Sequence, residues 1–60
     1  MERSYIVIYN TSVQDFESEL QQNSINRYII LNNLMAVIYV EDNFYEEKLS
    51  NLKTISWWEI

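Results

Sequence analysis

The chain contains neither glycine nor proline, which restricts how its backbone can turn. Glycine normally supplies positive φ, and proline presets the φ of many turns. Asparagine is the substitute expected here, because its short amide tolerates the left-handed region and hydrogen-bonds the neighbouring backbone. The asparagines that separate the apolar runs are Asn10, Asn23, Asn32, Asn33 and Asn43. We therefore expect turns at these positions, with no linker or repeat between them.

Cysteine and histidine are also absent, and their absence removes whole classes of chemistry. The chain can form no disulfide, no usual zinc, copper or iron–sulfur ligand set, and no Ser/His or Cys/His nucleophile. The acidic residues Glu41, Asp42, Glu46 and Glu47 lack the ligand spacing and the glycine of a calcium-binding EF-hand loop. We therefore expect them to form a helix cap and a solvated helix face. We expect a single domain over residues 1–60, without cofactor, metal or enzymatic activity of its own.

The charge balance is acidic, with nine acidic and four basic residues and a formal charge of −5. A protein that binds a phosphate backbone needs a clustered cationic face, whereas Arg3, Arg27, Lys48 and Lys53 are scattered. The apolar run near the start is too short for a signal-peptide core or a membrane span. We therefore expect no nucleic-acid partner, no membrane partner and a cytoplasmic location.

The first half of the chain predicts a strand followed by a short amphipathic helix. Ser4–Tyr9 is rich in the β-branched and aromatic residues that are typical of strands. Ser12, followed three residues later by Asp15, has the pattern of a helix start. The apolar residues that recur after it at helical spacing are Val13, Phe16 and Leu20.

The second half predicts a hairpin, a second helix and a closing strand. Two apolar runs flank Asn32 and Asn33, which can adopt the positive φ of a tight hairpin turn. Asp42 or Asn43 is the candidate cap of the second helix, which has acidic residues early and lysines late. The apolar stripe of this helix consists of Tyr45, Leu49 and Leu52. The closing strand is the segment "ISWWEI".

The order of these elements is β-α-β-β-α-β, which predicts an α+β, ferredoxin-like fold. Its antiparallel sheet carries both helices on one face and leaves the other face open. An open face is normally polar, which gives clean alternation along each strand. The alternation fails here, because the strands are apolar at both odd and even positions.

Strand parity predicts which side chains lie on each face. We expect the helix side to bury Ile6, Ile8, Ile29, Leu31, Ala36, Ile38 and Val40, together with Ile55 and Trp57. We expect the open face to carry Tyr5, Val7, Tyr9, Tyr28, Ile30, Met35, Val37, Tyr39 and Trp58. Tyrosine suits a surface that is buried part of the time, because its hydroxyl keeps a hydrogen bond. So large an apolar face predicts protein docking, with Trp58 as a rigid aromatic anchor.

Several alternatives would also account for so apolar a face. The parity could be off by one residue, or more chain in a larger protein could close the sheet. The chain could also be a self-associating ferredoxin-like module that forms a homodimer through this face. A free-standing acidic regulator that mimics nucleic acid is a further alternative, but helix capping accounts for most of the acidic residues.

Over nearly its full length the chain resembles the prodomains, or inhibitor-type propeptides, of subtilisin-like serine proteases. The resemblance lies in the opening "YIVIY", the hairpin leading into "AVIYVED", a second helix ending near Leu52, and a last strand from Ile55 into an acidic residue. The "SWWE" ending is similar to the germination-type proteases of spore-forming bacteria. That similarity implies a spore-associated location as the alternative to the cytoplasm.

The resemblance implies an intramolecular chaperone and bound inhibitor of a catalytic domain from the same precursor. In this family the open sheet face docks on two surface helices of the protease, which gives the open-face residues above a docking role. Glu59 matches the acid that caps a protease helix, where a carboxylate accepts backbone N–H groups; a solvated terminal charge is the alternative. The family's tail lies in the substrate cleft, so Ile60 is a possible cleft-binding end if Trp57–Ile60 leaves the sheet early.

Overall fold

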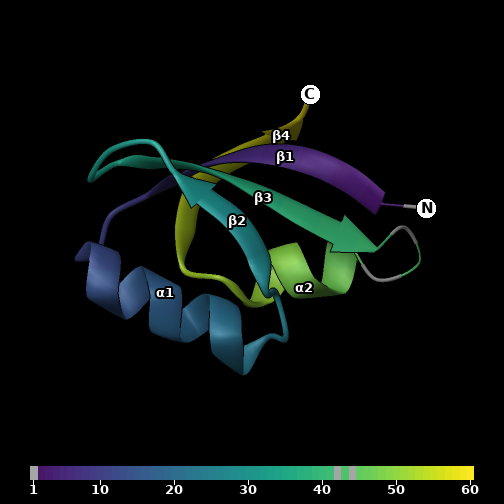
Figure 1. Cartoon of the computed structure of the whole chain (residues 1–60), viewed down its shortest axis with the longest axis horizontal. Coiled ribbons are helices and arrows are strands. Elements are labelled where there is room, and N and C mark those ends of the chain that lie inside the picture. The colour runs from purple at the N-terminus through teal and green to yellow at the C-terminus, as the bar shows by residue number, and fades with distance from the viewer. Residues whose placement is uncertain (1, 42, 44) are drawn as a thin grey trace.

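The chain forms a four-stranded antiparallel sheet with both helices on one side of it (Figure 1). The structure is a computed structural model that describes residues 2–41, 43 and 45–60. The elements in chain order are β1 (Glu2–Tyr9), α1 (Val13–Gln22), β2 (Arg27–Ile30), β3 (Met35–Glu41), α2 (Tyr45–Asn51) and β4 (Thr54–Glu59). The predicted ferredoxin-like order is confirmed. No helix in the described ranges is long and apolar enough to cross a membrane.

The strand order in the sheet is β2-β3-β1-β4, so β2 and β4 form its two edges. Every pairing is antiparallel. The register of β1 against β4 shifts near the end of β1, where Ile8 pairs with Ser56 but Tyr9 pairs with Thr54. Ile55 is therefore the extra residue of a β-bulge, which bends the edge strand and increases its twist.

Helix α1 begins with the Ser12 cap that its sequence predicts, and a second side-chain hydrogen bond closes its other end. The Ser12 Oγ accepts a hydrogen bond from the Asp15 N–H at 3.1 Å, which satisfies one of the unpaired donors of the first turn. At the other end the Asn23 side chain donates to the Glu19 carbonyl at 2.9 Å. The buried residues of this helix are Phe16 and Leu20, as predicted.

Leu49 of helix α2 and Leu52, which directly follows the helix, pack into the core. Leu49 and Leu52 are almost fully buried, and Glu46 and Glu47 occupy the first turn. Negative charge near a helix N-terminus is favourable because it meets the positive end of the helix dipole. The proposed cap Asp42 and the side chain of Tyr45 lie outside what the structure describes.

The turns use asparagine differently from the prediction. Among the described residues, the one non-glycine residue with positive φ is Ser24, at 61°. The expected positive φ at Asn32 and Asn33 is therefore wrong, although the hairpin itself is present. Its loop is longer than a two-residue turn: the Asn32 Oδ1 accepts from the Leu34 N–H at 2.8 Å, and the Asn32 N–H donates to the Met35 carbonyl at 3.2 Å.

The core lies between the sheet and the helices. The Tyr9 ring stacks on Phe16 with a centroid distance of 4.1 Å, and its hydroxyl donates to the Asn32 carbonyl at 2.7 Å. Each large apolar side chain buried in this layer contributes about 1.5–3 kcal/mol. The buried residues are Tyr5, Val7, Tyr9, Phe16, Leu20, Ile25, Ala36, Ile38, Val40, Leu49 and Leu52.

The face predicted for β1 is wrong. Tyr5, Val7 and Tyr9 are in the core, with relative exposures of 1%, 0% and 0%. Ile6 and Ile8 therefore lie on the open face. The tyrosine hydroxyl does not force the ring outward, because the hairpin loop supplies a carbonyl acceptor for Tyr9 inside the fold.

The face predicted for β2 is also wrong, whereas that for β3 is confirmed. Tyr28 and Ile30 pack against the core, while Ile29 and Leu31 are 51% and 50% exposed. The core members of β3 are Ala36, Ile38 and Val40, as predicted. On β2 the exposed residue Arg27 has the same parity as Ile29, so it marks the solvent side of the strand.

Candidate functional site

The open face of the sheet carries an apolar row that crosses every strand. Residues directly opposite each other on antiparallel strands share a face. The register places Ile6 opposite both Val37 on β3 and Trp58 on β4, and it places Val37 opposite Ile29 on β2. Ile8 and Met35 pair on the same face, one step along the strands. We call these residues the apolar band: Ile6, Ile8, Ile29, Met35, Val37 and Trp58.

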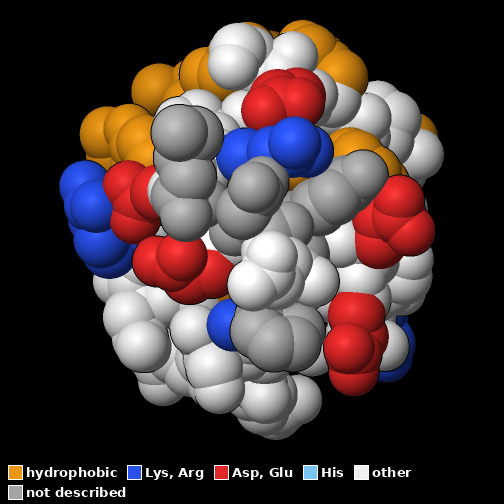
Figure 2. Space-filling model, turned by 90° about the vertical axis from the view of Figure 1, so that its right-hand side faces the viewer, with side chains coloured by type: hydrophobic (Ala, Val, Ile, Leu, Met, Phe, Trp, Pro, Cys, Tyr) orange, Lys and Arg blue, Asp and Glu red, His pale blue; other side chains and the backbone are white. Residues whose placement is uncertain are grey.

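Neither α1 nor α2 covers the apolar band, because both helices lie on the core face of the sheet, below it in Figure 1. Figure 2 shows hydrophobic side chains gathered along the upper rim of the molecule, with acidic and basic side chains on the flank below. Ile29 and Trp58 are about half-exposed at 51% and 45%, and Ile6, Ile8 and Val37 are partly exposed. Contiguous apolar surface of this kind is typical of interaction sites rather than of free solvent-facing sheets.

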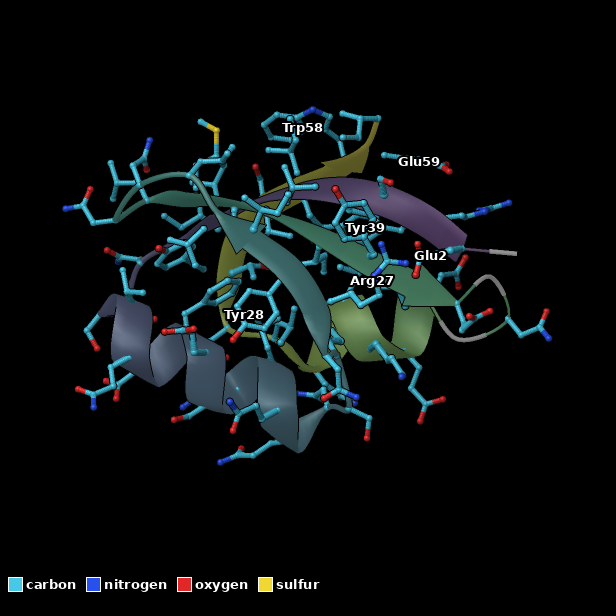
Figure 3. The ribbon with its side chains drawn as sticks, viewed as in Figure 1. Glu2, Arg27, Tyr28, Tyr39, Trp58 and Glu59 are labelled. Atoms are coloured by element: carbon cyan, nitrogen blue, oxygen red, sulfur yellow. The ribbon has the colours of Figure 1, made fainter. Side chains whose placement is uncertain are left out.

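A charged cluster closes one end of the apolar band. The Arg27 guanidinium lies over the Tyr39 ring at 5.0 Å from its centroid. Its Nη1 donates to both carboxylate oxygens of Glu2, at 2.6 and 2.7 Å. Arg27 on β2 thus reaches across β3 to β1, as Figure 3 shows. The ion pair is largely exposed, so its contribution to stability is small, but it orients Tyr39 at the border of the apolar surface.

The two tryptophans lie on opposite faces of β4, as strand parity predicts. Trp58 is on the open face opposite Ile6, and Figure 3 shows it above the sheet, away from the helices. Trp57 is on the helix side opposite Val7 and makes an edge-to-face contact with Tyr5 at 5.7 Å. The expectation that Trp57 and Ile55 are sealed under the helices is wrong, because they are 36% and 65% exposed. The helices leave β4 uncovered.

The end of the chain stays in the sheet. β4 extends to Glu59, and the Ile60 N–H donates to the Ser4 carbonyl at 3.0 Å. This excludes the early departure of Trp57–Ile60 from the sheet in this conformation. Glu59 lies opposite Tyr5, on the helix side, and pairs with Arg3 at 3.7 Å. The helix-capping role of Glu59 and the cleft-binding role of Ile60 stay predictions.

Two core-side tyrosines have perturbed acidity, and both lie away from the open face. The Tyr28 hydroxyl donates to Glu17 at 2.8 Å, and this hydrogen bond is the main cause that raises the pKa of Tyr28. Burial, with a smaller effect of the Glu17 charge, raises the pKa of Tyr9. Both phenols are therefore neutral at physiological pH. Through Glu17 and Phe16 they hold α1 against the sheet, and they do not form a reactive site.

Two open hollows on the helix side are lined by polar residues. One, of about 430 Å³, lies between the end of α1 and α2 and is lined by Gln22, Asn23, Ser24, Glu47, Lys48 and Asn51. It lacks the apolar lining and convergent polar groups of a small-molecule site. Within the part of the chain that the structure describes, no group of three acidic side chains is placed to hold a metal ion.

Some of the predicted docking residues lie on the open face of the sheet, and the others lie in the core. Met35, Val37, Tyr39 and Trp58 are on the open face. Tyr5, Val7 and Tyr9 are buried, and Tyr28 is turned toward α1. The parity prediction missed Ile6, Ile8 and Ile29, together with the Arg27–Glu2 pair at the border. The polar residues Ser4 and Arg27, which share a parity with the missed isoleucines, were the signal that could have found them.

The search against protein-family models gives no match, and no curated protein matches the chain. The apolar band and its charged border are therefore the features from which a function can be inferred.

Proposed function

We propose that the chain is a protein-binding domain that docks the apolar band of its sheet on the catalytic domain of a subtilisin-like protease. It would act there as an intramolecular chaperone and bound inhibitor. The observation that carries the proposal is the row Ile29–Val37–Ile6–Trp58, which presents apolar side chains from all four strands on one uncovered surface. The sequence resemblance to protease prodomains supports the choice of partner.

The apolar band combines an aromatic anchor, an apolar centre and a polar rim, which are typical of a protein-binding surface. Trp58 supplies a rigid aromatic side chain that loses little conformational entropy on binding, and the aliphatic residues beside it provide a contiguous apolar surface. Arg27 and Glu2 form a polar rim at one end, where hydrogen bonds to a partner remain possible in contact with water.

Titration of the chain onto a subtilisin-like catalytic domain, followed by calorimetry and by residual proteolysis, tests the proposal. We expect a complex at micromolar concentration and slower proteolysis. Ile29→Asp and Val37→Asp place a carboxylate inside the proposed interface, so each should weaken the complex by at least about tenfold.

Ser18→Asp is the matched control, because Ser18 is exposed on α1, on the other side of the molecule. It adds the same charge and should leave the affinity unchanged. Ile29 is half-exposed, so Ile29→Asp should leave the circular dichroism spectrum intact and separate loss of binding from loss of folding. Absence of any complex with the unmodified chain, or equal weakening by Ser18→Asp, would rule out docking through the apolar band.

A further inference from the structure

The open face of the sheet carries carboxylates at one end and apolar side chains at the other. At the first end Glu2 of β1 is opposite Glu41 of β3. At the other end, next to the hairpin between β2 and β3, Ile8 is opposite Met35. The row of the apolar band between these ends crosses all four strands. The face therefore has a direction, which limits how a second sheet can lie on it.

The size and charge of this face fit a second copy of the chain. A protein–protein interface of standard size buries about 800 Å² of each partner, which is about a fifth of the 3958 Å² that this chain exposes. The open face forms the whole side of the domain opposite the helices (Figure 1). Much of the negative charge lies on α1 and α2, which carry Asp15, Glu17, Glu19, Glu46 and Glu47. Two copies that meet through their sheets therefore turn those charges away from each other.

Two arrangements bring the sheets of two copies face to face about a two-fold axis. With the axis parallel to the strands, equivalent ends coincide, so Glu2 and Glu41 of one copy face the same carboxylates of the other. Like charges in direct opposition are destabilising. With the axis across the strands, the carboxylate end of one copy lies over the hairpin end of the other, where Asn10 and Asn33 are exposed. Amide N–H groups can donate to carboxylates, so the charges favour this second arrangement.

We propose that a second copy of this chain occupies the apolar band, with the two-fold axis crossing the strands at the row that contains Val37 and Ile6. Each side chain of that row then meets the same row of the other copy, and water leaves both apolar bands. Aligned sheets pack about 10 Å apart with their strands within about 30° of each other. The inference concerns the free chain and does not rest on the protease partner proposed above, which would compete with the second copy for the same surface.

Sedimentation equilibrium on the free chain, without protease, tests the dimer. We expect a reversible monomer–dimer equilibrium for the unmodified protein. Ile29→Asp places one carboxylate from each copy in the interface, so it should lower the association constant by about a hundredfold. Ile29 is half-exposed, so the variant should keep its circular dichroism spectrum. Ser18→Asp adds the same charge at an exposed position of α1 and should leave the association constant unchanged.

Trp58→Ser and Trp57→Ser make the same change on the two faces of β4. Trp58 is opposite Ile6 on the open face, whereas Trp57 is opposite Val7 on the helix side. Trp58→Ser should weaken dimerisation about tenfold or more, and Trp57→Ser should leave it unchanged. A monomeric unmodified chain at millimolar concentration, or equal weakening by the two variants, would overturn the proposal and leave the apolar band to another partner.

A spin label distinguishes the two arrangements. The chain has no cysteine, so Asn33→Cys provides a single labelling site at the hairpin. A strand rises about 3.3 Å per residue, so an axis across the strands at Val37 places the labels of the two copies on the order of 25 Å apart. An axis along the strands would bring both hairpins to the same end, within about 15 Å of each other. Pulsed electron paramagnetic resonance measures this separation, and the shorter distance would overturn the arrangement proposed here.

Discussion

Replacing Val7 by threonine in one variant and Val37 by threonine in another makes the same chemical change on the two faces of the sheet. Threonine has nearly the shape of valine and suits strands equally well, so cavity and propensity effects are small in both variants. Val7 is fully buried, and its cross-strand neighbours Ala36 and Trp57 offer no acceptor for a hydroxyl. Val37 is partly exposed on the open face, where water can solvate the new hydroxyl.

The expected loss of stability differs sharply between the two variants. A hydroxyl buried without a partner costs about 1–3 kcal/mol, whereas a partly solvated one should change the free energy of unfolding by less than about 0.5 kcal/mol. A domain of 60 residues has a total stability of roughly 3–9 kcal/mol. Val7→Thr should therefore remove a large share of that stability and lower the melting temperature by about 4–8 °C per kcal/mol.

Urea unfolding followed by tryptophan fluorescence and by far-ultraviolet circular dichroism measures both variants. The midpoint should fall for Val7→Thr with an unchanged slope, because the substitution alters the native state rather than the unfolded chain. The Val37→Thr midpoint should stay close to that of the unmodified protein. A larger loss for Val37→Thr than for Val7→Thr would refute the assignment of faces, and the apolar band with it.

Two further predictions concern the contacts that hold α1 in place. The Glu19 carboxylate accepts the Lys53 backbone N–H at 2.7 Å, so Glu19→Ala should lower the free energy of unfolding by about 1 kcal/mol in the same urea assay, and Ser18→Ala by much less. The Tyr28 hydrogen bond to Glu17 makes the folded state hold the phenolic proton more tightly than the unfolded state, so its stabilising effect is complete below pH about 10 and is lost as pH rises through the raised pKa of Tyr28. Glu17→Gln should bring the tyrosinate absorbance titration of Tyr28 back toward its ordinary range, and an unchanged titration would contradict this assignment.

Sequence patterns predict the helices of this chain well because each one carries its own local signals. Ser12 and Asp15 define the start of α1, and Phe16 and Leu20 define its buried stripe, without reference to the rest of the fold. The hairpin was predictable from its apolar runs. Its turn geometry was not, because Asn32 closes the loop with a side-chain hydrogen bond instead of a positive φ.

The faces of β1 and β2 could not be read from hydrophobicity, because both strands are apolar at odd and even positions. Tyrosine was expected outside because it is amphipathic, yet Tyr9 finds an acceptor in the Asn32 carbonyl and fills the space beside Phe16. The better guide was the polar residue in each strand. Ser4 on β1 and Arg27 on β2 are on the open face, and Glu41 has the same parity as the open-face residues of β3.

The pairing of Ser4 with Ile60, one step beyond the Tyr5–Glu59 pair, also determines how the domain would respond to force. β1 and β4 are neighbours and antiparallel, so the two ends of the chain emerge at the same end of the sheet, as Figure 1 shows. Pulling these ends apart would load the hydrogen bonds between the strands one pair at a time, in an unzipping geometry rather than in shear. The fold should therefore be mechanically weak along this axis, and β4 should peel away before the packing of α1 against the sheet is disturbed.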